Sequence, residues 1–361
     1  MTESDRRSFL AASAAGALAT QPLFGAVDKP AGPVRVGQIG TKHAHAGGKM
    51  AAMRKFPELF EVVGVAEPDS EQRNRVQDSP AYRGVNWMTE EELFNTSGLE
   101  AVAVETRIDG LLSSAQRCVE AGLHIHLDKP AGDSLPEFRN ICKTADAQGV
   151  MIQMGYMFRS NPAFRFTFNA VRQGWLGDIF QVHCEMSKKI GDSTRAQLSR
   201  YAGGSMFELG CHLIDAVVTV LGAPHRVTSF NRNTRPDFDD LKDTCLAVFE
   251  YPNATASIRS SVCEVEGGRR RQFTVCGTKG TVVIRPLEPF RLSLTLESDT
   301  ETYRRGTHQL ELPASTGRYD GDMQHFAAVI RNKEPAEYNT DHDLAVQEAV
   351  LRASNMPLNV E

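Results

Sequence analysis

The first part of the chain alternates short apolar runs with segments of mixed polar and apolar composition. The apolar runs are rich in valine, isoleucine and leucine and predict strands at 34–40, 61–66, 99–104, 122–127 and 150–155. The segments between them predict helices at 44–56, 69–77, 111–121 and 135–148. Strands that alternate with helices at this spacing form a parallel sheet through right-handed crossovers. Residues 34–155 are therefore predicted to be an α/β domain with a doubly wound parallel sheet.

After residue 155 the pattern changes to a few helices and a succession of strands. Helices are predicted at 163–173, 206–221, 319–331 and 343–353. Strand-like runs occur at 179–186, 226–231, 244–251, 254–263, 272–276, 280–284 and 291–297. Consecutive strands joined by turns favour an antiparallel sheet. Residues 156–355 are therefore predicted to be a C-terminal α+β domain with an open, mostly antiparallel sheet.

Composition narrows the classes of partner. The 361 residues include 45 acidic and 40 basic side chains, a formal net charge of −5. A chain with this balance has no overall attraction to phosphate backbones, so no nucleic-acid partner is expected. The 7 cysteines are scattered without a Cys-x-x-Cys pair, which is typical neither of a disulfide framework nor of a zinc knuckle.

The N-terminus reads as a targeting segment. Arg6 and Arg7 precede Phe9 and Leu10, and a run of small and apolar residues follows. This order resembles a twin-arginine export signal, and the run is too short to span a bilayer. We expect residues 1–26 to be a signal peptide that directs the folded protein through the twin-arginine export machinery to the periplasm or beyond. The mature protein is expected to have no membrane span.

The first strand is followed by an altered dinucleotide-binding turn. Such a turn normally reads Gly-x-Gly-x-x-Gly, whereas this chain has Gly40-Thr41-Lys42-His43-Ala44-His45, so only the first glycine is present. Glu67 ends the second predicted strand, 27 residues after Gly40. A carboxylate at this place accepts the ribose hydroxyls of adenosine and repels a 2′-phosphate. The sequence therefore predicts NAD as the cofactor, in preference to NADP.

Two motifs further along the chain carry a family resemblance. Asp128-Lys129-Pro130 follows a predicted strand, and Glu208-Leu-Gly-Cys-His212-Leu-Ile-Asp215 lies in a predicted helix. They match the Glu-Lys-Pro and Asp-x-Gly-x-His-x-x-Asp motifs of the glucose-fructose oxidoreductase, inositol dehydrogenase and MocA (Gfo/Idh/MocA) family, and residues 34–355 resemble it as a whole. The resemblance implies a Rossmann-type first domain, a nicotinamide-dependent oxidoreductase and a homodimer or homotetramer.

The motifs contain the groups that hydride transfer from an alcohol needs, a base and a cation beside the developing alkoxide. The resemblance implies that His212 is the acid/base, that Lys129 binds the substrate hydroxyl and the nicotinamide ribose, and that Glu208 contacts substrate. Glu208 and His212 are four residues apart on one helix, a spacing that lets the carboxylate orient the imidazole.

Further site residues are predicted around these three. Tyr156, Arg159 and Asp215 are candidates for substrate binding, although Asp215 could equally pair locally and Arg159 could be a surface residue. The candidates for cofactor binding are Gly40, Thr41, Lys42, His43, Glu67, Thr106 and Lys129. His43 and His45 could ligate zinc together with Glu208 and His212, but the adjacent Lys42 favours phosphate binding. No residue is therefore assigned as a metal ligand.

These features predict an NAD-dependent oxidoreductase that acts on a sugar, cyclitol or related polyol. Because an exported enzyme has no access to a cytosolic NAD pool, the NAD is expected to be tightly bound and recycled within the catalytic cycle. Three alternatives stay open: an enzyme that cleaves glycosides with the help of NAD, a carbohydrate-binding protein that has lost its cofactor, and a metal-dependent lyase. The second is favoured by the two missing glycines and by Thr106-Arg107-Ile108, where the family has Thr-Pro-Asn.

Overall fold

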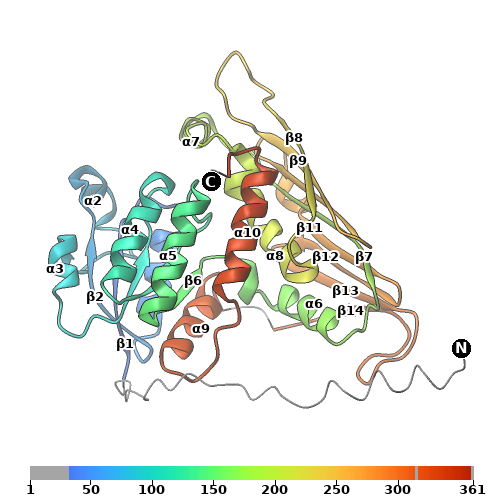
Figure 1. Ribbon diagram of the computed structural model, residues 1–361, viewed down its shortest axis with the longest axis horizontal. Coiled ribbons are helices and arrows are strands. Elements are labelled where there is room, and N and C mark those ends of the chain that lie inside the picture. The colour runs from blue at the N-terminus through green and yellow to red at the C-terminus, as the bar shows by residue number, and fades with distance from the viewer. Residues whose placement is uncertain (1–31, 314–315, 359–361) are drawn as a thin grey trace, which may run out of the picture. The chain divides into compact units, whose positions relative to one another are not determined.

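The computed structural model describes residues 32–313 and 316–358, and its N-terminal part is a parallel sheet (Figure 1). Six strands lie in the order β3-β2-β1-β4-β5-β6, and every neighbouring pair is parallel. They are β1 (Val34–Ile39), β2 (Phe60–Ala66), β3 (Trp87–Met88), β4 (Ala101–Val104), β5 (His124–Leu127) and β6 (Ile152–Met154). The chain order reverses between β1 and β4, the kind of switch point at which open α/β sheets bind ligands. The predicted doubly wound sheet is confirmed.

Helices follow the strands of this sheet. They are α1 (Ala46–Lys55), α2 (Ser70–Val76), α3 (Glu90–Phe94), α4 (Ile108–Glu120) and α5 (Leu135–Gln148). α4 and α5 lie side by side on one face of the sheet (Figure 1). Both ends of α5 are capped. Ser134 accepts a hydrogen bond from the Glu137 amide at the first turn, and Gly149 ends the helix with φ 66°. Because serine and glycine are typical capping residues, the bounds of this helix can be predicted from the sequence.

The C-terminal part contains an eight-stranded sheet in the order β14-β13-β12-β11-β7-β10-β9-β8. Its strands are β7 (Ile179–Ser187), β8 (Arg226–Arg232), β9 (Thr244–Glu250), β10 (Thr255–Ser261), β11 (Gln272–Gly277), β12 (Gly280–Leu287), β13 (Phe290–Leu296) and β14 (Gly306–Leu310). Only β7 and β10 pair in parallel, so the sheet is mixed but mostly antiparallel, as expected.

The remaining helical segments are η1 (Met157–Ser160), α6 (Pro162–Arg172), α7 (Asp192–Leu198), η2 (Met206–Gly210), α8 (Cys211–Leu221), η3 (Gly267–Arg270), α9 (Asp320–Ile330) and α10 (Thr340–Ala353). Of these, η2 is a π-helical turn that runs directly into α8. α6 and α8 lie on the inner face of the large sheet, and α10 contacts both α8 and α5 (Figure 1). α10 therefore connects the helical layers of the two sheets.

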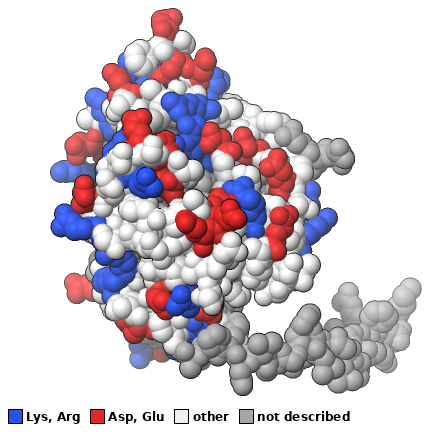
Figure 2. Space-filling view, turned by 90° about the vertical axis from the view of Figure 1, so that its left-hand side faces the viewer, with Lys and Arg blue, Asp and Glu red and all other residues white. Residues whose placement is uncertain are grey.

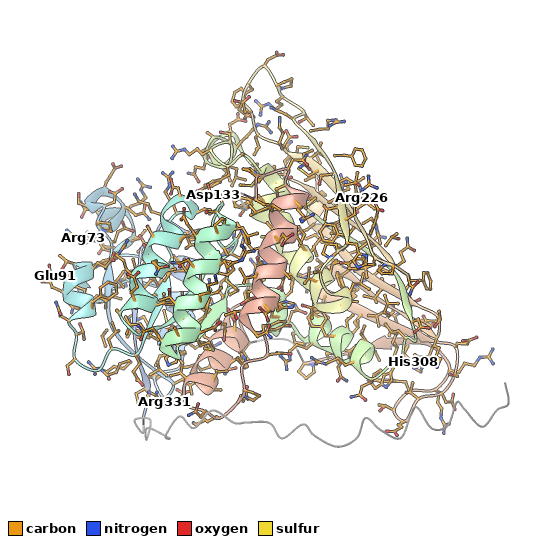
Figure 3. All side chains as sticks on the ribbon, viewed as in Figure 1. Arg73, Glu91, Asp133, Arg226, His308 and Arg331 are labelled. Carbon is orange, nitrogen blue, oxygen red and sulfur yellow. The ribbon has the colours of Figure 1, made fainter. Side chains whose placement is uncertain are left out.

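Helix α9 belongs to the second domain by sequence position but packs against the first sheet. Met323 and Phe326 share a buried cluster with Val34 and Val36 of β1. At the end of α9, the Arg331 guanidinium (Figure 3) contacts the Glu100 carboxylate at 2.7 and 2.8 Å. Helix α9 therefore contributes to the core beside β1 although it lies far beyond residue 155 in the chain.

The remaining expectations about membrane and charge can be compared with the described residues. Within 32–313 and 316–358, no helix has the length and apolar character needed to cross a bilayer. Figure 2 shows acidic and basic side chains interspersed over one face, as the small net charge leads one to expect. The predicted signal peptide at 1–26 lies outside the described residues.

Candidate active site

The turn after β1 supplies the first part of the site. Gly40 has φ 80°, and a Cβ added there would lie 2.7 Å from the Cα of Thr106, which follows β4. Only glycine combines this backbone conformation with such a close approach. The turn therefore keeps the feature that the first glycine of a dinucleotide fingerprint provides, and Thr106 lies beside it.

Glu67 stabilises this turn from the end of β2. One of its carboxylate oxygens accepts hydrogen bonds from the Thr41 amide and the Thr41 hydroxyl, both at 2.8 Å, and the other accepts one from the Asp69 amide at 3.1 Å. The side chain is buried. Lys42, at the second glycine position, extends outward and pairs with Asp69 at 2.6 Å. Glu67 thus shapes the corner where an adenosine ribose binds in this fold.

A groove of about 310 Å³ opens beside the turn. It runs between the carboxyl ends of the parallel strands and the α7–η2 segment of the second domain. Its basic side chains are Lys42, Arg75, Arg107 and Arg200, and its acidic ones are Asp69 and Glu208. Sequence reasoning missed Arg75, Arg107 and Arg200, which come from three separate segments. Cations at a helix-lined groove of this fold suit a pyrophosphate.

Lys129 lies where β5 ends and is almost completely buried. Its Nζ donates a hydrogen bond to the Glu208 backbone carbonyl at 2.6 Å and lies 3.7 Å from the Glu208 carboxylate. Burial opposes the charged form, but the surrounding Cys211, Glu208 and Asp128 outweigh it and raise the pKa of Lys129. The lysine is therefore a fixed cation beside Glu208, which lines the groove.

His212, near the start of α8, is also buried, and its Nδ1 has no hydrogen-bond partner. Burial, with Lys129 and His45 nearby, holds the pKa of His212 well below its usual range. The expected pairing with Glu208 does not form among the described residues, because the Glu208 carboxylate faces the ammonium groups of Lys129 at 3.7 Å and Lys188 at 4.0 Å. A neutral imidazole attracts a carboxylate less than two cations do.

Of the three predicted substrate-binding residues, Arg159 and Asp215 form a buried ion pair. Arg159 Nη2 lies 2.6 Å from Asp215 and 2.6 Å from Asp343, and the guanidinium stacks 4.0 Å from the Tyr338 ring. Of the alternatives left open for Asp215, the local pair is the one observed, and Arg159 is not a surface residue. Tyr156 is buried with its ring centroid 6.1 Å from that of His212. Substrate binding by Arg159 and Asp215 stays a prediction that this pairing does not favour.

Two buried imidazoles make the stability of the fold sensitive to pH. Burial, reinforced by the charge of Lys49, lowers the pKa of His126, as burial does for His212. In the folded state each imidazole binds its proton at a lower pH than in the unfolded chain, where the pKa of histidine is about 6.5. Unfolding therefore takes up protons, and the free energy of unfolding is expected to fall by up to about 1.4 kcal/mol per pH unit for each imidazole as the pH decreases below about 6.5.

Urea denaturation between about pH 7 and pH 5.5 measures this slope. The His126→Gln variant is expected to show a slope smaller by about one proton, whatever its stability at neutral pH. A free energy of unfolding that is independent of pH over this interval would show that these imidazoles are not held neutral.

Comparison with protein families matches two segments of the chain. Residues 34–156 match the model described as "Oxidoreductase family, NAD-binding Rossmann fold", and residues 164–283 match the "GFO/IDH/MocA C-terminal domain". The trans-1,2-dihydrobenzene-1,2-diol dehydrogenase of Bos taurus is 26% identical over 231 residues, which are 63% of this chain and 65% of that protein. The Sus scrofa enzyme of the same name is 26% identical over 71% of this chain and 73% of its own length.

Solved structures show the same fold at lower identity. The aldose-aldose oxidoreductase of Caulobacter crescentus, solved with glycerol, superposes with a TM-score of 0.75 at 19% identity and covers 90% of this chain and 98% of its own. The 3-ketoreductase KijD10 of Actinomadura kijaniata, solved with TDP-benzene and NADP, gives a TM-score of 0.71 at 18% identity, over 90% of this chain and 98% of its own. With its Rossmann sheet, its Lys129 and His212 motifs and both family models, this chain belongs to the GFO/IDH/MocA family of oxidoreductases.

Proposed function

We propose that this protein is a nicotinamide-dependent oxidoreductase that interconverts an alcohol and a carbonyl on a sugar, cyclitol or related polyol. The observation that carries the proposal is the convergence of Lys129, Glu208 and His212 at the carboxyl end of β5, next to the groove. They supply a fixed cation, a carboxylate and a neutral imidazole within one buried corner. The dihydrodiol dehydrogenases and the aldose-aldose oxidoreductase support an alcohol-bearing substrate by their names.

The groove fits a dinucleotide at its first turn. Gly40 packs closely against Thr106 and adds no side chain to the turn, and Arg107 and Arg200 line the groove as cations for the pyrophosphate. When bound, the nicotinamide supplies or accepts a hydride. Lys129 then stabilises negative charge on the substrate oxygen, and neutral His212 takes up the hydroxyl proton during oxidation. Glu208, paired with Lys129, holds that cation in place and offers its second oxygen to a substrate hydroxyl.

The proposed dinucleotide is NAD. Two carboxylates, Glu67 and Asp69, lie at the corner where the adenosine ribose binds, and a 2′-phosphate there meets their negative charge. Lys42 is already neutralised by Asp69 and gives a 2′-phosphate little net attraction.

The proposal includes export of the folded protein and a cofactor that does not leave between turnovers. It rests on the twin-arginine-like residues Arg6 and Arg7 and on the absence of an NAD pool outside the cytoplasm. In such an enzyme the dinucleotide reduced by one polyol is reoxidised by reducing a second carbonyl compound. A variant of this cycle oxidises and then re-reduces one glycoside while its glycosidic bond is eliminated.

Protein recovered from the periplasm after native export is expected to carry close to one nicotinamide dinucleotide per chain. Acid release followed by enzymatic cycling measures the cofactor, and export after replacing Arg6 and Arg7 by lysine serves as the control for the route. If the exported protein contains no nicotinamide, the proposal of a retained cofactor is wrong. If the protein stays in the cytoplasm, the proposal of export is wrong.

A second candidate, a carbohydrate-binding protein without a cofactor, is favoured by one specific observation. Lys42 and His45 stand where the fingerprint has glycine, and the His45 ring points into the protein toward Asp128. A panel of polyols and aldoses, mixed with the protein and NAD, distinguishes the two candidates. Nicotinamide reduction with at least one of them supports the oxidoreductase, whereas binding of sugars with no binding of either dinucleotide supports the second candidate.

A further inference from the structure

Two guanidinium groups in the second domain share one carboxylate. Arg318 Nη2 lies 2.9 Å from Glu288 Oε1, and Arg271 Nη1 lies 3.5 Å from Glu288 Oε2. Arg271 directly precedes β11, Glu288 lies in the turn between β12 and β13, and Arg318 lies shortly before α9. Three segments of the chain thus bring two positive charges and one negative charge together, so this group carries an excess of one positive charge.

The pKa of Arg271 reflects this excess. Burial lowers the pKa of this guanidinium, and the nearby charge of Arg318 lowers it further. Glu288 and Glu208 act in the opposite direction but do not restore the ordinary value. Glu208 already faces two lysine ammonium groups, at 3.7 and 4.0 Å, so its charge is shared. A further anion beside Arg271 is therefore stabilised.

Other acidic side chains of the same region have cations of their own. Glu185 and Glu264 both pair with Arg270, at 3.1 and 3.0 Å, and both also pair with a second arginine, on β10. Asp320, at the start of α9, pairs with Lys55. Among the described residues, these carboxylates are therefore already matched and do not neutralise the excess charge.

Contacts place Arg271 beside the surroundings of Glu208. Its side chain is only 15% exposed, and its Nε donates a hydrogen bond to the Ser187 carbonyl at 3.0 Å. The next residue, Lys188, faces the Glu208 carboxylate at 4.0 Å. Arg271 is thus held by the backbone of β7 close to a proposed catalytic carboxylate.

Arg318 lies near His212. It lines a cavity of about 40 Å³ together with Phe158 and Glu288, and the ring centroid of Phe158 lies 5.7 Å from that of His212. Burial is the main reason for the low pKa of His212, and the charge of Arg318 contributes to it. Among the described residues, neither of the two arginines lines the groove assigned to the dinucleotide. Their excess charge is therefore available to the other reactant.

We propose that Arg271 and Arg318 bind a carboxylate of the substrate, which makes the substrate a sugar acid, such as a uronate or an aldonate. The inference rests on the proposed function and narrows its substrate class. A carboxylate carries one negative charge and matches the excess of one positive charge, whereas a phosphate ester carries about 1.5 to 2 negative charges at pH 7. Guanidinium groups offer parallel N–H donors to the two oxygens of a carboxylate. A substrate held in this way presents a hydroxyl to Lys129 and His212.

Matched pairs of an acid and its neutral counterpart test this proposal in steady-state assays with NAD. Glucuronate is compared with glucose, galacturonate with galactose, and gluconate with glucitol. The acid of at least one pair is expected to have a kcat/KM higher by about tenfold or more, the size expected for a hydrogen bond between charged groups. In Arg318→Gln this preference is expected to fall to about threefold or less, chiefly through a higher KM for the acid. Arg226→Met, at an exposed arginine of β8 (Figure 3), is the matched control and should keep the preference.

Calorimetry separates a failure of this carboxylate site from a failure of the proposed reaction. Titration of the same compounds into protein saturated with NAD is expected to show an acid that binds at one site per chain, about tenfold or more tighter than its neutral counterpart, and more weakly to Arg318→Gln and Arg271→Gln. Such binding without turnover of any pair supports the carboxylate site and contradicts the oxidoreductase. Turnover of neutral sugars with no preference for an acid in either measurement, or unchanged acid binding in both folded arginine variants, overturns the carboxylate site and leaves the oxidoreductase in place.

Discussion

Replacing Lys129 by methionine is expected to lower turnover by about a hundredfold or more while the protein stays folded. Methionine keeps the length and apolar stem of the side chain but removes the charge that lies 3.7 Å from Glu208 at the end of β5. Removing one fixed donor or cation from a developing oxyanion typically costs 10² to 10³ in turnover. Steady-state rates with the best substrate of the polyol and aldose panel measure the loss.

Lys188→Met is the matched control. Lys188 also lies near Glu208, at 4.0 Å, but about a third of its side chain is exposed, so its removal is expected to change turnover only a few fold. His212→Asn should lose about as much turnover as the Lys129 variant and still bind the dinucleotide, because His212 lies on the second domain. Full activity in both folded variants would place the chemistry elsewhere.

Replacing Arg159 by methionine is expected to lower the free energy of unfolding by about 3–5 kcal/mol. The guanidinium is the ion-pair partner of the buried Asp215 and Asp343, and its removal leaves Asp215 with only the His342 imidazole, at 3.6 Å, and Asp343 with no ion-pair partner among the described residues. Urea denaturation followed by circular dichroism measures the change. The expected loss is large because a buried charge without its partner keeps its full desolvation penalty.

Arg165→Met provides the comparison for this prediction. Arg165 pairs with Glu337 at 2.8 Å on the surface, with half of its side chain exposed, and such pairs contribute about 0–1 kcal/mol. If Arg159→Met is as stable as Arg165→Met but loses affinity for substrate, the substrate-binding role predicted from the sequence is the correct one.

The sequence predicts most strands and long helices within about two residues, because each has a repeated apolar pattern and a clear turn at its ends. Helix 135–148 has the predicted bounds, since Ser134 and Gly149 cap it. The two-residue β3, the five-residue β14 and the short helices α3 and α7 were not predicted, as segments of this length contain too few positions to show a period. Pattern alone also assigns α9 to the second domain, whereas its apolar face packs on the first sheet.

The site was predictable where a motif is local and unpredictable where a contact joins distant segments. Lys129, His212 and Gly40 could be found from motifs of a few residues. The partners of Asp128 come from residues 43, 45 and 49, about 80 positions earlier in the chain, and no local pattern brings them together. In the same way, the pairing of Glu208 with Lys129 and not with His212 depends on how β5 and η2 meet.

Fluorescence titration with reduced NAD, carried out on purified protein that has first been freed of any bound dinucleotide, tests the central claim most directly. The account predicts saturable binding at one site per chain, tighter than for reduced NADP, and loss of that binding in Gly40→Val, because a side chain there collides with the backbone of Thr106. Equal and unsaturable signals from the wild type and from folded Gly40→Val would contradict the assignment of the groove to a nicotinamide dinucleotide.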